Sequence, residues 1–275
     1  MFFALIYYIA KQGDPINLLF VGDVVSSYGV DFLLNTLPLI KKAYKTDFCI
    51  VNGENSAVGN GITPNSYHDL LSAGADLITG GNHTFRRPEF TDVLDDEFSA
   101  VIRPANVHSS APGRGYAVLT RRSKKLGVIN LLGESFMDMK VTDPFDKLDE
   151  LIKLLNGQNI KNILVDFHAE ATGEKRAMGF YADGRVSALL GTHTHVRTAD
   201  ARILPNGTAY QTDVGMTGVM NSVLGVNPDD IIKRLHTGLP VRFTNNPGPC
   251  SMGCTIIKTD DNTGKAVAIE SYEIL

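Results

Sequence analysis

The segment INLLFVGD, residues 16–23, is a continuous apolar run that ends in a glycine and an aspartate. Such a run is typical of a strand buried on both faces of a parallel sheet. A helical pattern near residues 29–45 separates it from a second strand pattern, FCIVNGEN, at 48–55. A helix is then predicted over 63–74, where Thr63 can cap the N-terminus. Strand and helix therefore alternate along this half of the chain.

More strand patterns follow toward the C-terminus, and a final hairpin is predicted around residues 260–262. The later strands are expected within 75–83, 125–134, 161–170, 185–195 and 207–215. Strand–helix alternation followed by a strand-rich second half predicts an α/β sandwich with central sheets and helices outside. No repeat or linker interrupts the pattern, so a single domain over 16–275 is expected.

The composition is that of an ordinary globular protein. Its 275 residues are 43% hydrophobic and 20% charged, which is enough apolar material for a sizeable core. Lysine plus arginine is 26 and aspartate plus glutamate is 30, giving a net charge of −4. That balance argues against a protein whose main task is to bind a phosphate backbone. Three cysteines without a CxxC pair favour a reducing compartment, so a cytoplasmic location is expected.

The N-terminal segment is apolar but differs from the rest of the chain. Residues 1–10 read MFFALIYYIA, whereas a membrane-spanning helix needs about 20 apolar residues. Lys11 follows the apolar stretch, while a signal peptide carries its basic residues before it. We therefore expect residues 1–15 to be an appendage that packs on the surface or on a partner chain, with a membrane anchor as the alternative.

Five of the apolar segments are followed by polar side chains of the kinds that bind metals. Together the five segments contribute eight such side chains, namely Asp23, Glu54, Asn55, Asn82, His83, His168, His193 and His195. Because ligands of open α/β sheets bind at the carboxyl ends of the strands, these side chains are expected to meet at one edge. Carboxylate oxygens, amide oxygens and imidazoles together suit Mn, Fe or Zn. The set exceeds what one ion can use, so the sequence predicts a two-metal site of the type that promotes displacement at phosphorus.

Each of these residues also has a purely structural explanation. Taken singly, Asp23 could cap a helix, and Glu54 and Asn55 could be turn residues. His168 could be a core histidine that bonds to a backbone carbonyl. The agreement of five separate segments favours the metal site.

Spacing supplies further expectations near the site. His193 and His195 are two residues apart, so their rings would leave the same face if the backbone is extended there. Asp166, a strand residue, is expected to face away from the site. Arg86 and Arg87 either favour an anionic substrate or begin a solvated helix.

Five motifs stand in order along the chain: GDV at 22–24, NGEN at 52–55, GNHTF at 81–85, DFHAEAT at 166–172 and GTHTHVRTADARILPNGTAYQTDVGMTG at 191–218. Together they resemble the YmdB-like bacterial metallophosphoesterases, a branch of the calcineurin-like superfamily. The similarity extends from about Ile16 to the C-terminus. It implies a four-layer α/β/β/α sandwich, a two-metal centre and phosphodiesterase activity, including activity on cyclic nucleotides.

The resemblance also implies roles for individual residues. The metal ligands would be Asp23, Asn55 and His195 at one ion, Asn82, His168 and His193 at the other, and Glu54 as the bridge. His83 would be the general acid, a role that suits an unligated imidazole at neutral pH. Val25 stands where the wider superfamily has a histidine, and Asn55 would replace that imidazole, as in the YmdB-like branch. Iron is the expected metal, with manganese or zinc as alternatives.

The expected function is that of a soluble phosphodiesterase with two metal ions per chain, acting on a small phosphodiester such as a cyclic nucleotide. A phosphomonoesterase or nucleotidase with the same centre is one alternative. A regulatory metal-containing binding protein with little turnover is another. RNA is a further candidate partner, but the net charge does not indicate it. No membrane partner is expected, and oligomerisation stays open.

Overall fold

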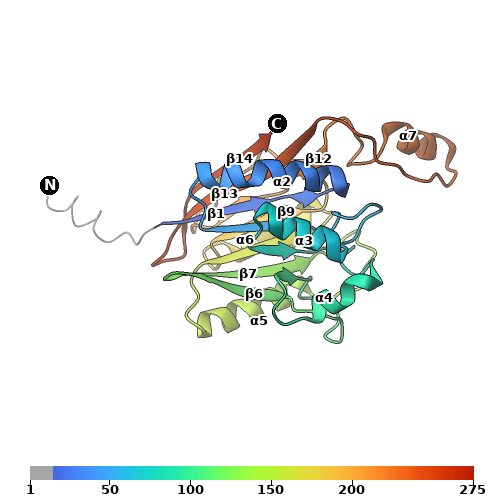
Figure 1. The fold of residues 1–275 in the computed structure, drawn as a ribbon. Helices are drawn as coiled ribbons and strands as arrows, with labels where there is room; N and C mark the ends of the chain where they lie inside the picture. The colour runs from blue at the N-terminus through green and yellow to red at the C-terminus, as the bar shows by residue number, and fades with distance from the viewer. Residues whose placement is uncertain (1–14) are drawn as a thin grey trace.

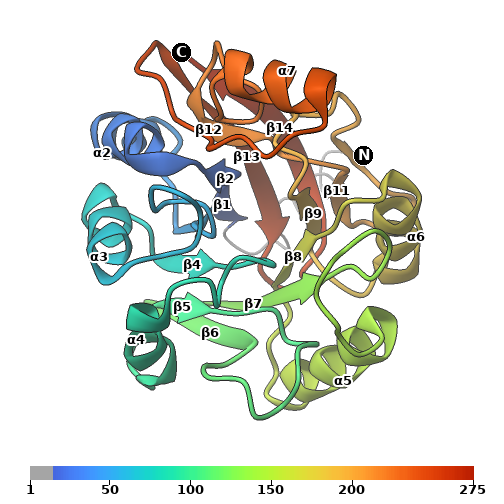
Figure 2. The ribbon, with the colours of Figure 1, turned by 90° about the vertical axis from the view of Figure 1, so that its right-hand side faces the viewer.

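Two β-sheets lie face to face at the centre of the molecule, and helices cover both outer faces (Figure 2). The computed structural model describes residues 15–275. Within them the larger sheet contains β1 (Pro15–Val21), β2 (Asp23–Val24), β3 (Phe48–Asn52), β4 (Leu77–Thr79), β5 (Val101–Ile102), β12 (Met216–Val219), β13 (Cys250–Asp260) and β14 (Ala266–Ile274). The smaller sheet contains β6 (Tyr116–Arg121), β7 (Lys124–Leu132), β8 (Ile163–His168), β9 (Ala188–Thr192), β10 (Arg202–Ile203) and β11 (Ala209–Gln211).

The strand order brings segments from distant parts of the sequence together. The larger sheet has the order β2-β12-β13-β1-β3-β4-β5, with β14 paired to β13, and the smaller has the order β10-β11-β9-β8-β7-β6. Strands β1, β3, β4 and β5 are parallel to one another. Strands β7, β8, β9 and β11 are likewise parallel. Within each sheet these parallel strands therefore end at one common edge.

The apolar residues of strand β1 contribute to two different hydrophobic cores. Ile16, Leu18 and Phe20 belong to the hydrophobic core between the two sheets. Leu19 and Val21 belong to the core between the larger sheet and its helices. Because successive side chains of a strand point to opposite faces, a strand with a core on each side needs apolar residues at consecutive buried positions, here 18–21, while Asn17 near the start is only partly buried.

The helices form the two outer layers. The larger sheet is covered by α2 (Ser26–Ala43), α3 (Pro64–Ala73), the 3₁₀ helix η1 (Pro88–Phe90) and α4 (Thr91–Asp95), and the smaller by α5 (Pro144–Gly157) and α6 (Thr172–Ala182). Each helical layer shares a hydrophobic core with its sheet, and a third core lies between the sheets. The expected four-layer α/β/β/α sandwich is confirmed.

Helix boundaries follow the local capping chemistry. Helix α3 begins as predicted, because the Thr63 hydroxyl accepts a hydrogen bond from the backbone N–H of Ser66 at 3.2 Å. Helix α2 begins at Ser26, earlier than the predicted 29–45. No side chain caps it there, and the Ser26 N–H instead donates to the Asn55 carbonyl at 2.9 Å. This start could therefore not be predicted from a capping residue.

The C-terminal part contains the predicted hairpin and a long excursion. Strands β13 and β14 pair antiparallel around the turn that follows Asp260. Between β12 and β13 the chain forms an arm, residues 220–249, which carries α7 (Pro228–Thr237). Figure 1 shows α7 projecting from the end of the sandwich. None of the residues of α7 is buried.

The structure describes the whole of the predicted domain but almost none of the predicted appendage. The predicted appendage at residues 1–15 lies outside the described residues, except for Pro15, which begins β1. The single domain over 16–275 stays a prediction. Among the described helices, none combines the length and the apolar character needed to cross a bilayer.

The junction of β1 and β2 needs a glycine. A Cβ atom at Gly22 would lie 2.0 Å from the carbonyl oxygen of Gly215, part of the rigid backbone. We expect Gly22→Ala to lower the free energy of unfolding by about 1–3 kcal/mol, the usual cost of overpacking. The matched control is Gly157→Ala at the end of α5, where an added Cβ would meet nothing within 4 Å. Equal stability of the two variants in urea unfolding would contradict the close approach at Gly22.

Candidate metal centre

The structure brings all eight polar residues singled out in the sequence to one edge of the two sheets. Asp23 lies in β2 and His168 ends β8, while the others follow the ends of β3, β4 and β9. The full set is Asp23, Glu54, Asn55, Asn82, His83, His168, His193 and His195. Glu54, Asp23 and His168 are completely buried, so the cluster lies at the bottom of a depression rather than on an open surface.

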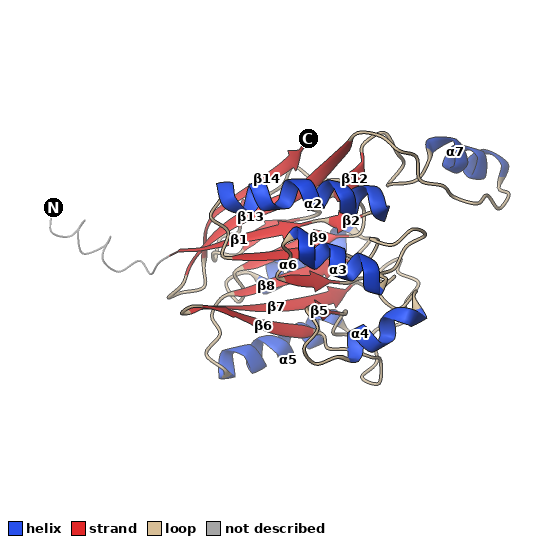
Figure 3. Cartoon of the chain, viewed as in Figure 1, coloured by secondary structure: helices blue, strands red, loops and turns tan. Residues whose placement is uncertain are grey.

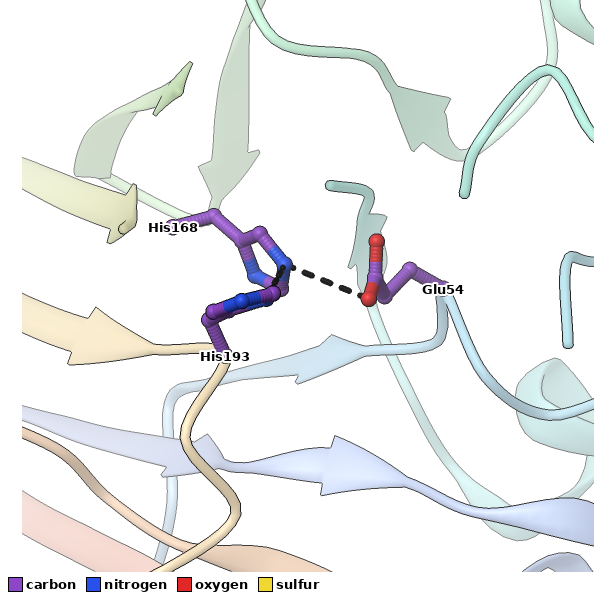
Figure 4. A group of neighbouring side chains, drawn as sticks. All are labelled: Glu54, His168 and His193. Carbon is purple, nitrogen blue, oxygen red and sulfur yellow. Dashed lines mark hydrogen bonds and ion pairs between the residues drawn. The ribbon is translucent and has the colours of Figure 1, made fainter. Parts of the chain in front are cut away.

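Four of these side chains direct ligand atoms toward one point, and three of them are drawn in Figure 4. The Nε2 atom of His168 lies 3.2 Å from Glu54 Oε1 and 3.1 Å from His193 Nδ1. The Oδ1 atom of Asn82 lies 3.1 Å from the same nitrogen. One ligand atom each from Glu54, His168 and His193 lies within 4.8 Å of the others. Two imidazole nitrogens and two oxygens therefore converge as a divalent cation requires.

A second group lies beside the first. His195 Nε2 is 3.6 Å from Asp23 Oδ1 and 3.2 Å from Asn55 Nδ2. Asn55 Nδ2 also donates to Glu54 Oε1 at 2.9 Å, so one Glu54 oxygen contacts both groups. Coordination by Asn55 would require its amide to rotate by 180°, which exchanges the oxygen and the nitrogen.

Two local features fit a cation. Asp23 Oδ1 is buried without a hydrogen-bond partner, a costly arrangement that a bound ion would relieve. A Cβ atom at Gly81 would lie 2.2 Å from Glu54 Oε2 and 2.5 Å from His168 Nε2, so only glycine leaves this space open. Together with the donor set, these features show that the residues present suit divalent ions.

The remaining ring nitrogens of the three histidines meet protein groups. His168 Nδ1 lies 2.8 Å from Thr192 Oγ1, His195 Nδ1 lies 3.1 Å from the Leu224 carbonyl oxygen, and His193 Nε2 lies 3.1 Å from Glu170 Oε2. Protons held at these atoms, by hydrogen bonds for His168 and His195 and by the Glu170 carboxylate for His193, would leave lone pairs on the nitrogens that face the cluster. The rings are therefore oriented as metal ligands commonly are.

The prediction that Asp166 faces away from the site is wrong. Its Oδ1 accepts a hydrogen bond from Thr192 Oγ1 at 2.7 Å, and Thr192 is the partner of His168. Residues 166 and 168 point to the same side of β8, because side chains alternate with a period of two. Burial raises the pKa of Asp166 to about 6. Asp166 thus orients His168 through the Thr192 hydroxyl.

Burial and mutual contact shift the ionisation of the cluster. Burial raises the pKa of Glu54, but His168 and His83 more than offset it and hold that pKa well below its usual range. Burial lowers the pKa of His168, but the Glu54 carboxylate more than offsets this and raises the pKa to about 9. Burial together with the charge of His168 lowers the pKa of His193 to about 4. The buried carboxylates thus favour a positive charge within the cluster.

The turn between the two histidines is not extended. His193 has a φ of 101° and His195 a φ of 62°, both in the left-handed region that disfavours these residue types. Asp213 Oδ2 stabilises the turn by accepting bonds from the Thr194 N–H at 3.0 Å and hydroxyl at 2.8 Å. The rings consequently diverge, one toward His168 and one toward Asp23.

Sequence reasoning missed the residue that compensates the negative charge of Asp213. Lys175 Nζ donates to Asp213 Oδ2 at 2.7 Å, and both side chains are buried. A signal was present, because Lys175 shares the buried stripe of α6 with Met178, Gly179 and Ala182. A lysine at such a position implies a buried partner.

A cavity of about 1010 Å³ opens onto the cluster. Glu54, His83, His193 and His195 are among its lining residues. Residues 58–60 and 242–245 supply further parts of its wall. The cavity therefore gives a ligand access to both groups of donors.

The two arginines lie beside the loop at residues 58–60, and the role of favouring an anionic substrate stays a prediction. Arg86 lines the cavity and donates from Nε to the Gly59 carbonyl at 3.2 Å. Arg87 donates to the Asn60 carbonyl at 3.0 Å and immediately precedes η1. Both arginines therefore hold the loop that borders the cavity.

Known proteins resemble this chain in both sequence and fold. The model of the YmdB-like protein family matches residues 19–272. The chain belongs to this family. The 2′,3′-cyclic-nucleotide 2′-phosphodiesterase of Bacillus subtilis (strain 168), a YmdB-like relative, is 50% identical over 254 residues, which cover 92% of this chain and 95% of that protein.

Two solved structures are also similar over nearly the whole chain. A crystal structure of a novel phosphatase from Mycoplasma pneumoniae has a TM-score of 0.89 at 36% identity, covering 96% of this chain and 94% of that one. A hypothetical protein from Thermus thermophilus has a TM-score of 0.87 at 40% identity, covering 94% of this chain and 98% of that one. The YmdB-like fold therefore extends over both sheets, including β13 and β14.

The buried ion pair gives a test of how the histidine turn is held. Lys175→Met leaves Asp213 charged and buried, so we expect a loss of about 3–5 kcal/mol in the free energy of unfolding. The double variant Lys175→Met/Asp213→Asn should recover part of this loss, because no unpaired buried charge remains. Lys153→Met, at an exposed position of α5, is the control. Additive losses in urea unfolding would show that the two side chains are not coupled.

Proposed function

We propose that this protein is a phosphodiesterase that hydrolyses 2′,3′-cyclic nucleotides with two divalent metal ions. The observation that carries the proposal is the position of Glu54, whose Oε1 atom contacts both groups of metal-ligating side chains. A shared carboxylate between two groups of N and O donors is the arrangement of a two-metal site for displacement at phosphorus. The activity named for the 50% identical Bacillus subtilis relative supports the choice of substrate.

The proposed ligands divide between the two groups. They are Asp23, Asn55 and His195 for one ion, and Asn82, His168 and His193 for the other, with Glu54 shared. Divalent ions there would lower the pKa of a water molecule and polarise the phosphoryl oxygens. Nitrogen and oxygen donors suit iron, manganese and zinc, and we propose iron, as the family resemblance implies.

His83 is proposed as the general acid. It lines the cavity, and its Nδ1 atom lies 3.3 Å from Glu54 Oε1, which orients the ring. The Nε2 atom is then the one available to a substrate oxygen. In the reaction water loses one proton to solvent, its oxygen bonds to phosphorus and the bond to the 2′ oxygen breaks. The 2′ oxygen takes the proton from His83, which regains one from solvent. The product is a nucleoside 3′-monophosphate.

Variants of Asp23 and His83 separate metal binding from proton transfer. We expect Asp23→Ala to lose nearly all activity together with at least one metal ion per chain. His83→Ala should keep both ions and lose about 10²–10⁴-fold in kcat, the usual contribution of a general acid. Elemental analysis and hydrolysis of 2′,3′-cyclic AMP measure the two effects, with His108→Ala, at an exposed loop position, as the control. Full activity of His83→Ala, or of the chelated wild type, would contradict the proposal.

A phosphomonoesterase is the second candidate, because the 36% identical Mycoplasma pneumoniae relative is described as a phosphatase. The two functions differ in the bond that is cleaved. We expect kcat/KM for 2′,3′-cyclic AMP to exceed that for adenosine 3′-monophosphate at least tenfold. Faster release of inorganic phosphate from the monoester would favour the phosphatase instead.

A further inference from the structure

The arm, residues 220–249, is built outside the hydrophobic core yet reaches the site. Figure 3 shows α7 and its flanking loops standing apart from the sheets. None of the residues of α7 is buried, so core packing does not explain the segment. The returning limb of the arm nevertheless supplies Arg242, Phe243, Thr244 and Asn245 to the cavity wall.

Hydrogen bonds hold the two limbs of the arm together above the metal centre. The outgoing limb is tied to the site, because His195 Nδ1 donates to the Leu224 carbonyl at 3.1 Å. The returning limb is tied to the outgoing one by Asn245 Nδ2, which donates to the Gly225 carbonyl at 2.6 Å. The Asn227 N–H donates to the Thr244 carbonyl at 2.8 Å. The wall formed by residues 242–245 therefore has a fixed relation to a proposed metal ligand.

Phe243 is held within this wall by its neighbours. The Thr244 N–H and hydroxyl both donate to Asp230 Oδ2, at 2.9 and 2.6 Å. The guanidinium carbon of Arg234, from α7, lies 5.2 Å from the centroid of the Phe243 ring. Phe243 is nonetheless 39% exposed and lines the cavity. An aromatic ring that is both fixed and accessible is suited to stacking.

The cavity has more room than the reacting phosphate needs. Its volume of about 1010 Å³ is at the upper end of the range for small-molecule sites, roughly 300–1,000 Å³. Metal-ligating residues and Phe243 both line this one cavity. A ligand that carries both a phosphate and an aromatic group could contact both.

We propose that Phe243 is the base-recognition residue of this enzyme and that the arm exists to hold it over the substrate. The inference rests on the proposed function and adds the group that recognises the nucleoside. The base would stack on the Phe243 ring while the cyclic phosphate lies at the metal centre. Stacking accepts any nucleobase, so the four 2′,3′-cyclic nucleotides should have similar KM values.

The test compares a substrate with a base and one without. The substrates are 2′,3′-cyclic AMP and glycerol 1,2-cyclic phosphate, and the measured quantity is the ratio of their kcat/KM values. We expect Phe243→Ala to lower this ratio about 5- to 150-fold, the range that base–aromatic stacking supplies. Phe243→Tyr should retain most of it. Leu239→Ala is the matched control, because this residue is exposed on the same arm but is not among the cavity-lining residues.

The outcomes separate this inference from the proposed function. If Phe243→Ala hydrolyses both substrates at wild-type rates and the ratio of their kcat/KM values is unchanged, the stacking role is overturned. The proposed phosphodiesterase activity would not be affected by that result. Failure of the wild type to hydrolyse either compound would overturn the proposed function itself. Calorimetric binding of adenosine 3′-monophosphate gives a second readout, which should weaken in Phe243→Ala and not in Leu239→Ala.

One further substrate identifies the source of the base. A short oligoribonucleotide ending in a 2′,3′-cyclic phosphate carries the same terminal chemistry as the free nucleotide. If the oligoribonucleotide is hydrolysed as fast as 2′,3′-cyclic AMP and Phe243→Ala lowers both kcat/KM values equally, Phe243 also stacks on the terminal base of RNA. Turnover of the mononucleotide alone would restrict it to free nucleotides.

Discussion

The burial of two carboxylates, Asp23 and Glu54, is the constraint on which the rest of this structure depends. Both are fully buried, and Asp23 Oδ1 has no hydrogen-bond partner. Charges in such a place are costly unless positive groups or metal ions compensate them. The strand ends supply four histidines around the carboxylates, and Gly81 leaves the space between them open. The fold thus concentrates negative charge where we propose that two cations bind.

Support for this arrangement extends from the core to the surface. Asp166 and Thr192 hold His168 from within the sandwich. The Asp213–Lys175 ion pair stabilises the turn that carries the other two histidines, and the backbone strain at that turn is offset by these bonds. On the outer side, the arm is tied to His195 through the carbonyl of Leu224. The cavity wall that the arm supplies is therefore connected to the metal centre through this hydrogen bond.

The sequence was sufficient to predict the sandwich and the convergence of the site residues. The apolar segment at 16–21 predicted a buried strand, because side chains alternate between the two faces of a strand. The polar residues after each strand predicted a shared site, because parallel strands end at a common edge. The conformation at His193 and His195 was not predictable, since nothing in the residue types indicates a positive φ. Lys175 was overlooked because its partner lies in a different element and is brought to it only by tertiary packing.

The most direct test of the metal centre is a crystal structure of the manganese-loaded protein with anomalous diffraction at the manganese edge. The account predicts two anomalous peaks about 3.5–4 Å apart on either side of the Glu54 carboxylate. One should be bounded by Asp23, Asn55 and His195, and the other by Asn82, His168 and His193. A single peak, or peaks away from these side chains, would contradict it.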